Sequence, residues 1–308
     1  MLYHQPVLLQ ESVDALALKP GGIYVDVTFG GGGHSAHILT QMQGGQLYSF
    51  DQDTDAEQQA EKLISDKFTF VKANFRYLKK YLRLYGVKQV DGILADLGVS
   101  SHQFNTAERG FSTRFDGPLD MRMDKESPLT AQQVILEYSE EQLHRIFGLY
   151  GEVKNAKTLA REVVSARNVQ TIETIADFKQ AIMGCTPRGK ENKYLAQVFQ
   201  ALRIEVNDEL KALEEMLEQA VEVLKPGGRL SVISYHSLED RLVKNYIAKG
   251  KFFGEVEKDF FGNEIKPLDS VTRKPIVPGA LELQENNRSR SAKLRVAQKR
   301  ETPESLKK

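Results

Sequence analysis

The chain has 308 residues, and its 42 basic and 42 acidic side chains leave no formal net charge. Hydrophobic residues make up 41% and charged residues 27% of it, which is typical of a globular protein, and no apolar run approaches the ~20 residues of a membrane span. The single cysteine, Cys185, excludes an internal disulfide and leaves no thiolate zinc cluster. The first residues also lack the basic and apolar regions of a signal peptide. We therefore expect a cytoplasmic protein without a metal site or membrane segment, built as two domains or as one with a large insertion.

Basic residues are concentrated in two places, although the whole chain is neutral. From Arg288 to Lys308 they outnumber the acids, and a second basic cluster spans residues 188–193. On charge alone, a solvated surface explains both clusters better than a nucleic-acid interface does.

The first predicted strand, at residues 23–29, leads directly into four glycines, Gly30 to Gly33. Its β-branched and aromatic residues are typical of a buried strand. The glycines let the backbone turn sharply and come close to a ligand, where a Cβ atom would collide. A helix expected over residues 35–42 would direct its free N–H groups at that ligand. Strand, glycine loop and helix together predict a nucleotide-type cofactor site.

A second predicted strand, at residues 46–50, ends in Asp51, about twenty residues after the glycine loop. An acid at this place accepts hydrogen bonds from ribose hydroxyls. S-adenosylmethionine (SAM) and NAD both carry an adenosine ribose, so the two features admit either cofactor.

Strands predicted at 68–73 and 90–97 alternate with helices at 55–64 and 76–85. This alternation predicts a parallel, doubly wound α/β sheet. Ligands bind such sheets at the carboxyl ends of the strands. Because Phe75 and Asp96 follow or close the third and fourth strands, we expect them at the same crevice as the glycine loop and Asp51.

The alternation stops after the fourth strand. Residues 100–124 are predicted to form a long irregular loop, and residues 130–183 to be helical, with Thr130 and residues 139–142 as helix starts. An apolar stripe over residues 199–224 predicts one long helix leading into a strand at 229–234. The predicted sheet domain therefore comprises residues 1–110 and 205–308, and an all-helical domain, residues 111–204, interrupts it.

Tyr235 and His236 follow the strand at 229–234, so we expect them beside the crevice as candidates for touching substrate. A lone histidine is more often a hydrogen-bonded structural residue than a catalyst. Ser237 and Asp240 fit a capping box that opens the next helix. The last strand is predicted at residues 291–297.

Several long segments of this chain resemble one family, the bacterial SAM-dependent methyltransferases that modify the N4 amine of a cytidine in the decoding region of small-subunit (16S) ribosomal RNA. The resembling segments are residues 28–35, 96–101, 108–112, 117–123, 199–204 and 237–241. The resemblance extends from His4 to Arg295. It implies a Rossmann-like class I methyltransferase sheet and an inserted helical domain that helps to recognise RNA. It also implies a partner, small-subunit ribosomal RNA, which we expect within an assembled or nearly assembled subunit; a homodimer stays open.

By the motifs of that family, the SAM contacts fall on seven residues. They are Gly32, Gly33, His34, Asp51, Phe75, Asp96 and Gln103. Glycine N–H groups and a helix start can hold the methionine carboxylate, Asp51 the ribose hydroxyls, and Phe75 the adenine face.

Asp96 is the candidate catalytic residue, with Tyr235 and His236 as weaker candidates. The lone pair of a cytosine amine is delocalised into the ring, and an acceptor for the amino hydrogens localises it, so positioning and electrostatics supply most of the rate. Related DNA amino-methyltransferases carry an Asp/Asn/Ser-Pro-Pro-Tyr/Phe loop here, whereas residues 96–99 contain neither proline nor an aromatic residue. The base-stacking aromatic must then come from elsewhere, and Phe104, Phe111 and Tyr235 are the guesses.

Two other functions use part of the same pattern. An NAD-dependent reductase would share the glycine loop and Asp51, but it would also need a proton donor, and no Tyr-x-x-x-Lys pair indicates one. A non-catalytic RNA-binding assembly factor would keep the basic tail without needing the cofactor crevice. Fold alone does not decide among these functions.

Overall fold

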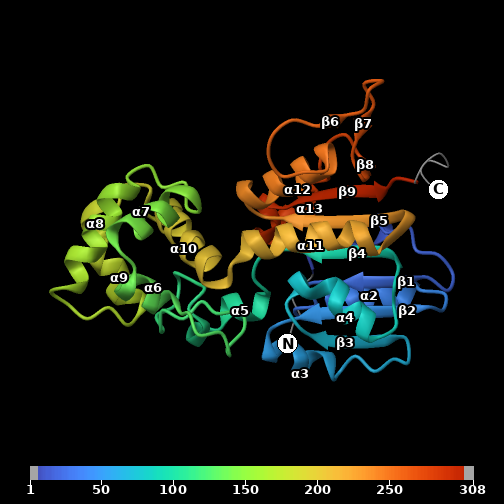
Figure 1. The fold of residues 1–308 in the computed structure, drawn as a ribbon. Coiled ribbons are helices and arrows are strands. Elements are labelled where there is room, and N and C mark those ends of the chain that lie inside the picture. Colours follow the sequence, from blue (N-terminus) through green and yellow to red (C-terminus); the bar gives the residue numbers. More distant parts are fainter. Residues whose placement is uncertain (1–5, 302–308) are drawn as a thin grey trace. The chain divides into compact units, whose positions relative to one another are not determined.

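A computed structural model describes residues 6–301, which form two compact units (Figure 1). The sheet unit contains the described residues up to Gly98 and from Leu210 onward, and the helical unit is Val99–Glu209. Its borders differ from the predicted 111–204 because residues 99–110 and 205–209 group with the helices. The Arg109 guanidinium, for example, donates to the carbonyls of Arg122 and Met123. His4, Lys307 and Lys308 lie outside the described residues.

The sheet unit is built on seven strands in the order β3-β2-β1-β4-β5-β9-β8. The first five pair in parallel, β9 runs antiparallel to β5, and β8 runs antiparallel to β9. The strands are β1 (Ile23–Asp26), β2 (Gln46–Asp51), β3 (Phe68–Lys72), β4 (Val90–Asp96), β5 (Leu224–Ser234), β8 (Leu268–Ser270) and β9 (Lys293–Lys299). The topology confirms the predicted α/β sheet, and the insertion follows its fourth strand as expected.

Helices cover both faces of this sheet, so its central strands are buried on both sides. The helices are α1 (Leu9–Asp14), α2 (Gly33–Gln41), α3 (Thr54–Ala60), α4 (Leu78–Leu84), α11 (Glu209–Val223), α12 (Ser237–Lys249) and α13 (Ala280–Glu285). In β1, Tyr24 packs in the cluster that includes residues of α1 and α2, while Val25 packs in the cluster that includes residues of α4, α11 and α12. Burial on both faces explains why β1 reads as a continuous apolar run.

The helical unit packs its helices around one apolar core. They are α5 (Ser101–Asn105), α6 (Ala131–Glu137), α7 (Glu140–Leu149), α8 (Ala156–Arg167), α9 (Ile175–Ala181) and α10 (Glu191–Asn207). Thr130 and Ser139 cap α6 and α7 in reciprocal capping boxes, which confirms both predicted helix starts. The loop predicted at 100–124 is less irregular than expected, since it contains α5 and a 3₁₀ turn at Ala107–Arg109.

The prediction of one continuous helix from the apolar stripe at 199–224 was wrong, because the helix is broken at one residue. Asp208 adopts the left-handed conformation, with φ of 48°, so α10 ends at Asn207 and α11 begins at Glu209. The apolar spacing continues across the break, which is why periodicity alone does not detect it.

A second, two-stranded sheet was not predicted. Strands β6 (Glu257–Lys258) and β7 (Glu264–Ile265) pair antiparallel and form a hairpin, labelled in the upper part of Figure 1. Strands this short and this polar carry no period-2 apolar signal. Within residues 6–301, no helix combines the length and the apolar character needed to cross a membrane.

Candidate cofactor and active site

The glycine loop is shaped by the protein's own packing. Helix α2 begins at Gly33, two residues earlier than predicted, and Gly30 and Gly32 have φ of 53° and 80°. A Cβ atom on Gly32 would lie 2.7 Å from the Phe29 ring, and one on Gly33 would lie 2.3 Å from the Pro6 ring. At Gly32 and Gly33, a Cβ atom would thus collide with the protein's own side chains, whereas the sequence predicted a collision with the ligand. Packing against Phe29 and Pro6 therefore requires glycine at both positions.

Asp51 is fixed to that loop at the end of β2. Its Oδ2 accepts from the Gly30 N–H at 2.8 Å, and its Oδ1 accepts from the Asp53 N–H at 2.9 Å. Burial raises the pKa of Asp51 to about 6, although these two hydrogen bonds oppose the shift. Each carboxylate oxygen keeps a further lone pair, and the side chain is partly exposed. Two oxygens with free acceptor capacity fit the two hydroxyls of a ribose.

Asp96 closes β4 and is brought together with two other predicted residues. Its Oδ1 accepts from the Tyr235 hydroxyl at 2.6 Å, and its Oδ2 lies 3.8 Å from His34 Nδ1. Burial raises the pKa of Asp96 to about 6, opposed by the charge of His34 and by the Tyr235 hydrogen bond. The same burial, together with Asp96, holds the pKa of Tyr235 well above its ordinary value, so Tyr235 stays a donor.

One nitrogen of the buried His34 ring has a defined hydrogen-bond role. Its Nε2 lies 3.2 Å from the Val7 carbonyl oxygen. Because a carbonyl only accepts, Nε2 carries the proton and Nδ1 faces Asp96. His34 therefore links the N-terminal segment, the first turn of α2 and the end of β4.

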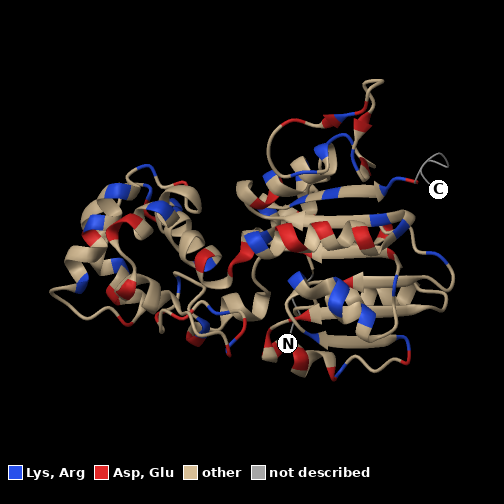
Figure 2. Cartoon of the chain, viewed as in Figure 1, with Lys and Arg blue, Asp and Glu red and all other residues tan. Residues whose placement is uncertain are grey.

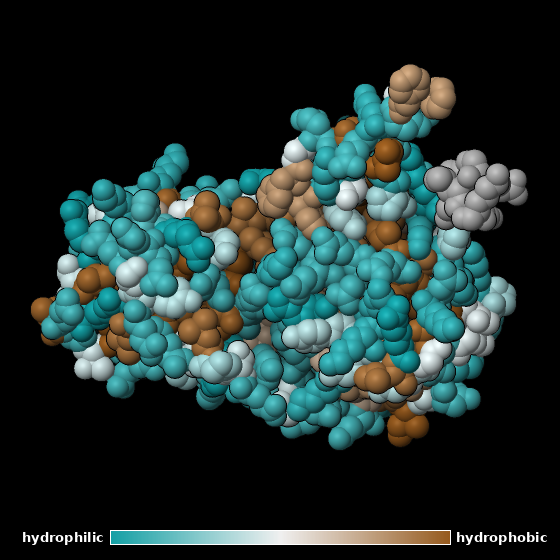
Figure 3. All heavy atoms as spheres, in the orientation of Figure 1, coloured by the Kyte–Doolittle hydropathy of each residue, from teal (hydrophilic) through white to brown (hydrophobic). Residues whose placement is uncertain are grey.

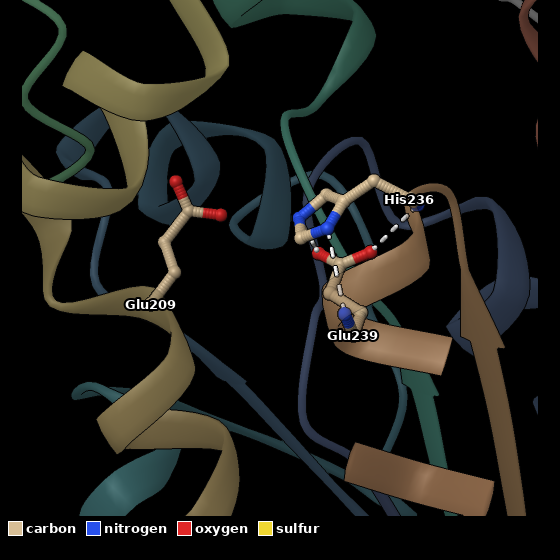
Figure 4. A group of neighbouring side chains, drawn as sticks. All are labelled: Glu209, His236 and Glu239. Carbon is tan, nitrogen blue, oxygen red and sulfur yellow. Dashed lines mark hydrogen bonds and ion pairs between the residues drawn. The ribbon is translucent and has the colours of Figure 1, made fainter. Parts of the chain in front are cut away.

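The other weak catalytic candidate, His236, caps a helix. It is the N-cap of α12, and the Glu239 carboxylate accepts from the backbone N–H groups of Tyr235 and His236 at 2.9 and 3.3 Å. Figure 4 shows the His236 ring beside the Glu239 carboxylate, with Nε2 3.1 Å from Oε1. The predicted capping box of Ser237 and Asp240 was therefore wrong by one residue.

Asp240 has other partners, which explains the shift. Its carboxylate accepts from Arg295 at 2.7 Å and from Lys293 at 3.1 Å, both on β9. These partners hold the pKa of Asp240 below its usual range. Two bases of the C-terminal cluster, Lys293 and Arg295, thus form ion pairs within the protein. This agrees with the interpretation that the cluster is not primarily a nucleic-acid interface.

A buried polar chain beneath the loop was missed at the sequence level. Asp26 accepts from the Ser35 hydroxyl at 2.6 Å and from the Thr28 N–H at 3.1 Å, and Ser35 is 2.7 Å from the Ser49 hydroxyl. Thr28 in turn accepts from the Asp96 N–H at 2.6 Å. Burial raises the pKa of Asp26. Its signal in the sequence was an acid inside an otherwise apolar strand.

The remaining predicted contacts have these positions. Phe75 opens a 3₁₀ turn after β3 and is partly buried against the core of the sheet unit. Gln103 belongs to the helical unit, where its side chain accepts from the Ser100 N–H at 2.9 Å as a capping box. Phe111 is buried in the core of that unit, which disfavours it as the base-stacking aromatic, and Phe104 is partly buried.

Comparison with known proteins identifies close relatives. A family model described as the MraW methylase family matches residues 1–300. A Ribosomal RNA small subunit methyltransferase H from Cytophaga hutchinsonii is 59% identical over 298 residues, covering 97% of this chain and 100% of that protein. A protein of the same name from Bacteroides thetaiotaomicron is 57% identical over 302 residues, covering 97% and 98%. A solved rRNA methylase from Streptococcus thermophilus covers 98% and 99% at 13% identity, and its TM-score of 0.42 is too low to support an inference.

Proposed function

This chain belongs to the MraW methylase family, and from that premise we propose that it methylates the exocyclic N4 amine of a cytidine in the decoding region of small-subunit (16S) ribosomal RNA. It is a SAM-dependent ribosomal RNA methyltransferase. Nearly full-length identity of 59% to a protein named for this class of substrate supports the proposal. The structural observation that carries it is the Asp96 carboxylate, held by Tyr235 next to the glycine loop.

The cofactor site follows from the residues already described. Asp51 would accept the ribose hydroxyls, and the glycine loop with the first turn of α2 would hold the methionine carboxylate. We assign Gly32, Gly33, His34, Phe75 and Gln103 to the same site on the family motif. Bound SAM supplies a methyl group made electrophilic by its positively charged sulfur.

Asp96 would prepare the amine for attack. A carboxylate that accepts from the amino hydrogens localises the nitrogen lone pair and favours the positive charge that nitrogen gains. The nitrogen would form its bond to the methyl carbon while the carbon–sulfur electron pair stays on sulfur, and the nitrogen would then release one proton. A pKa of about 6 suits Asp96 to accept this proton near neutral pH, because the ionised form still predominates there. Tyr235 would keep the carboxylate oriented.

The helical unit would contribute the RNA affinity. Arg188, Lys190 and Lys193 are exposed at the start of α10, where they are free to approach phosphates. We propose an assembled or nearly assembled small subunit as the substrate and, since that substrate is ribosomal, a cytoplasmic location. Homodimer formation stays an alternative that sedimentation of the purified protein decides.

Methyl transfer from tritiated SAM tests the proposal. The substrates are protein-free ribosomal RNA, isolated small subunits and whole ribosomes, and the labelled nucleoside is then identified and mapped. We expect N4-methylcytidine in the decoding region, formed most efficiently on isolated small subunits. Label on another base or region would contradict the proposal. Calorimetry with SAM and NADH separates the alternatives, because a reductase binds NADH and an assembly factor binds neither.

A further inference from the structure

We propose that the β6–β7 hairpin docks the enzyme onto a basic protein of the small subunit, with Phe260 and Phe261 entering an apolar pocket of that protein. The hairpin tip exposes Phe260 by 97% and Phe261 by 85%, and the two rings lie edge to face with centroids 5.6 Å apart. Figure 3 shows the hydrophobic colour at the end of this projection. A large apolar surface that stays solvated marks an interaction site. The inference rests on the proposed function.

The tip is a defined structure rather than a loose loop. The Asp259 carboxylate accepts from the N–H groups of Phe261 and Asn263 at 2.9 and 2.8 Å, and from the Asn263 side chain at 2.9 Å. The Asp259 N–H also donates to the Asn263 carbonyl, and Gly262 takes φ of 85° to close the turn. These bonds fix the backbone of the turn, and both phenyl groups on it stay exposed to solvent. Because the backbone of the turn is already ordered, less conformational entropy is lost when a partner covers the rings.

Charge decides between a protein and an RNA partner. Residues 255–264 carry four acids, Glu255, Glu257, Asp259 and Glu264, against one base, Lys258. In the cartoon of Figure 2, the red that marks Asp and Glu appears on both strands of the hairpin. Lys251 and Lys266 pair with Glu257 and Glu264 at 3.2 and 2.7 Å, but these two glutamates stay 69% and 44% exposed.

RNA phosphates need a surplus of positive charge, and this hairpin has a surplus of negative charge. An apolar tip with an acidic border instead complements an apolar pocket with a basic border. Proteins that coat ribosomal RNA are basic, so such a pocket on the subunit is the partner that the charges fit. The hairpin would then add affinity for the assembled subunit and none for protein-free RNA.

The first experiment removes the rings. Phe260→Ser with Phe261→Ser should raise the KM for isolated small subunits by at least about tenfold, as for buried aromatic residues at an interface centre. SAM affinity and binding of protein-free RNA should not change. The matched control, Ile64→Ser with Leu84→Ser, removes two exposed apolar side chains elsewhere in the sheet unit and should leave the KM unchanged. An unchanged KM in the hairpin variant overturns the inference.

The second experiment identifies the partner. Phe261 is replaced by photoreactive p-benzoylphenylalanine, and the cross-linked component of the subunit is identified. A cross-link to a basic subunit protein supports the inference, while a cross-link to RNA overturns it. The double variant Glu255→Lys with Glu257→Lys is an independent test of the partner's charge. Its affinity for subunits should fall if the partner is basic, and a rise in affinity would indicate RNA and overturn the inference.

A second copy of this chain is the remaining alternative partner for the hairpin tip. Sedimentation of the wild type and of the hairpin variant tests it, since a dimer that becomes monomeric in the variant would overturn subunit docking. The proposed function fails separately, if the wild type methylates no form of the RNA. A wild type that methylates protein-free RNA but not subunits would overturn this inference and leave the proposed cytidine chemistry standing.

Discussion

The two units of this protein bury different kinds of side chain. The sheet unit buries acids, hydroxyls and a histidine around its glycine loop and strand ends. They include Asp26, His34, Ser35, Ser49, Asp53 and Glu239. The helical unit buries Gln103, Arg109 and Ser112 in its first segment, whereas its residues 113–209, all described by the structure, bury only apolar and tyrosine side chains and glycine. Burying polar groups costs free energy unless each has partners, and the acids and hydroxyls around the glycine loop have hydrogen-bond partners.

That difference indicates where each unit acts. The sheet unit acts through fixed, partly buried groups such as Asp51 and Asp96, whose hydrogen bonds are already formed. From residue 113 to residue 209 the helical unit has an apolar core, so we expect any function of this part to lie on its surface. Variants of buried acids should therefore change chemistry or cofactor binding, and variants of exposed bases should change RNA binding alone.

The largest effect should follow from Asp96→Asn. The amide keeps the size and one acceptor oxygen but loses the charge that favours the transition state, so turnover should fall by roughly 10²–10³. Single-turnover transfer at saturating SAM and RNA measures this, and a modest rise in the SAM dissociation constant is allowed. Asp91→Asn, at the other end of the same strand and paired with Lys225, is the matched control and should keep its turnover. Near-normal transfer in Asp96→Asn would reduce Asp96 to a cofactor contact.

The same variant should be at least as stable as the wild type at pH 8. The folded-state pKa of Asp96 is raised to about 6, so its contribution to stability is present at low pH and is lost as pH rises through 6. Asn does not ionise, so the variant does not lose this stability as the pH rises. Thermal unfolding at pH 5 and pH 8 should show the variant gaining on the wild type at the higher pH. A variant that is less stable at pH 8 would show that the carboxylate stabilises the fold.

Asp51→Ala should weaken SAM binding by about 1.5–3 kcal/mol, as for lost hydrogen bonds to a charged group. The change also releases the N–H groups of Gly30 and Asp53, so the loop loses its tie to β2. Calorimetry measures the dissociation constant, and circular dichroism checks the fold. Asp66→Ala, an exposed acid of the same unit, is the control. An unchanged SAM dissociation constant would remove Asp51 from the site.

The strand ends could be predicted from the sequence because their signals are local. A glycine run after a β-branched strand, and an acid ending the next strand, locate Gly30 and Asp51 without knowledge of the rest. Predicting the position of Asp96 also required the alternation of strands and helices along the chain. Which groups touch it, His34 and Tyr235, was not predictable, because those contacts join segments far apart in the sequence.

The helix start near Tyr235 shows why local signals also fail. His236 with Glu239 and Ser237 with Asp240 offer capping boxes one residue apart. Arg295 and Lys293, more than 50 positions later, pair with Asp240 and so settle the choice. The break at Asp208 is likewise not a local signal. A left-handed residue costs roughly 1–2 kcal/mol of free energy, and tertiary packing must offset this cost.

Charge reversal in the helical unit tests the other half of the comparison. Changing Arg188, Lys190 and Lys193 to Glu should weaken RNA binding about tenfold or more at moderate salt. The slope of log K against log salt should flatten by roughly two to three, since fewer counterions are released. The control reverses three exposed lysines of the sheet unit, Lys62, Lys80 and Lys88, with the same change of net charge. SAM affinity falling equally, or RNA affinity changing equally in both sets, would contradict the assignment.

The smallest effect should follow from Tyr235→Phe, and pH resolves it. Loss of one hydrogen bond to Asp96 should slow transfer at pH 8 by about three- to tenfold. Because that bond lowers the pKa of Asp96, its loss should move the pKa further above 6. Protonated Asp96 cannot accept from the amine, so the acidic limb of the single-turnover rate should shift to higher pH. Tyr246→Phe, at a buried tyrosine of the sheet unit, should leave the limb in place. A uniform rate loss without a shifted limb would show that Tyr235 acts on the substrate directly rather than by positioning Asp96.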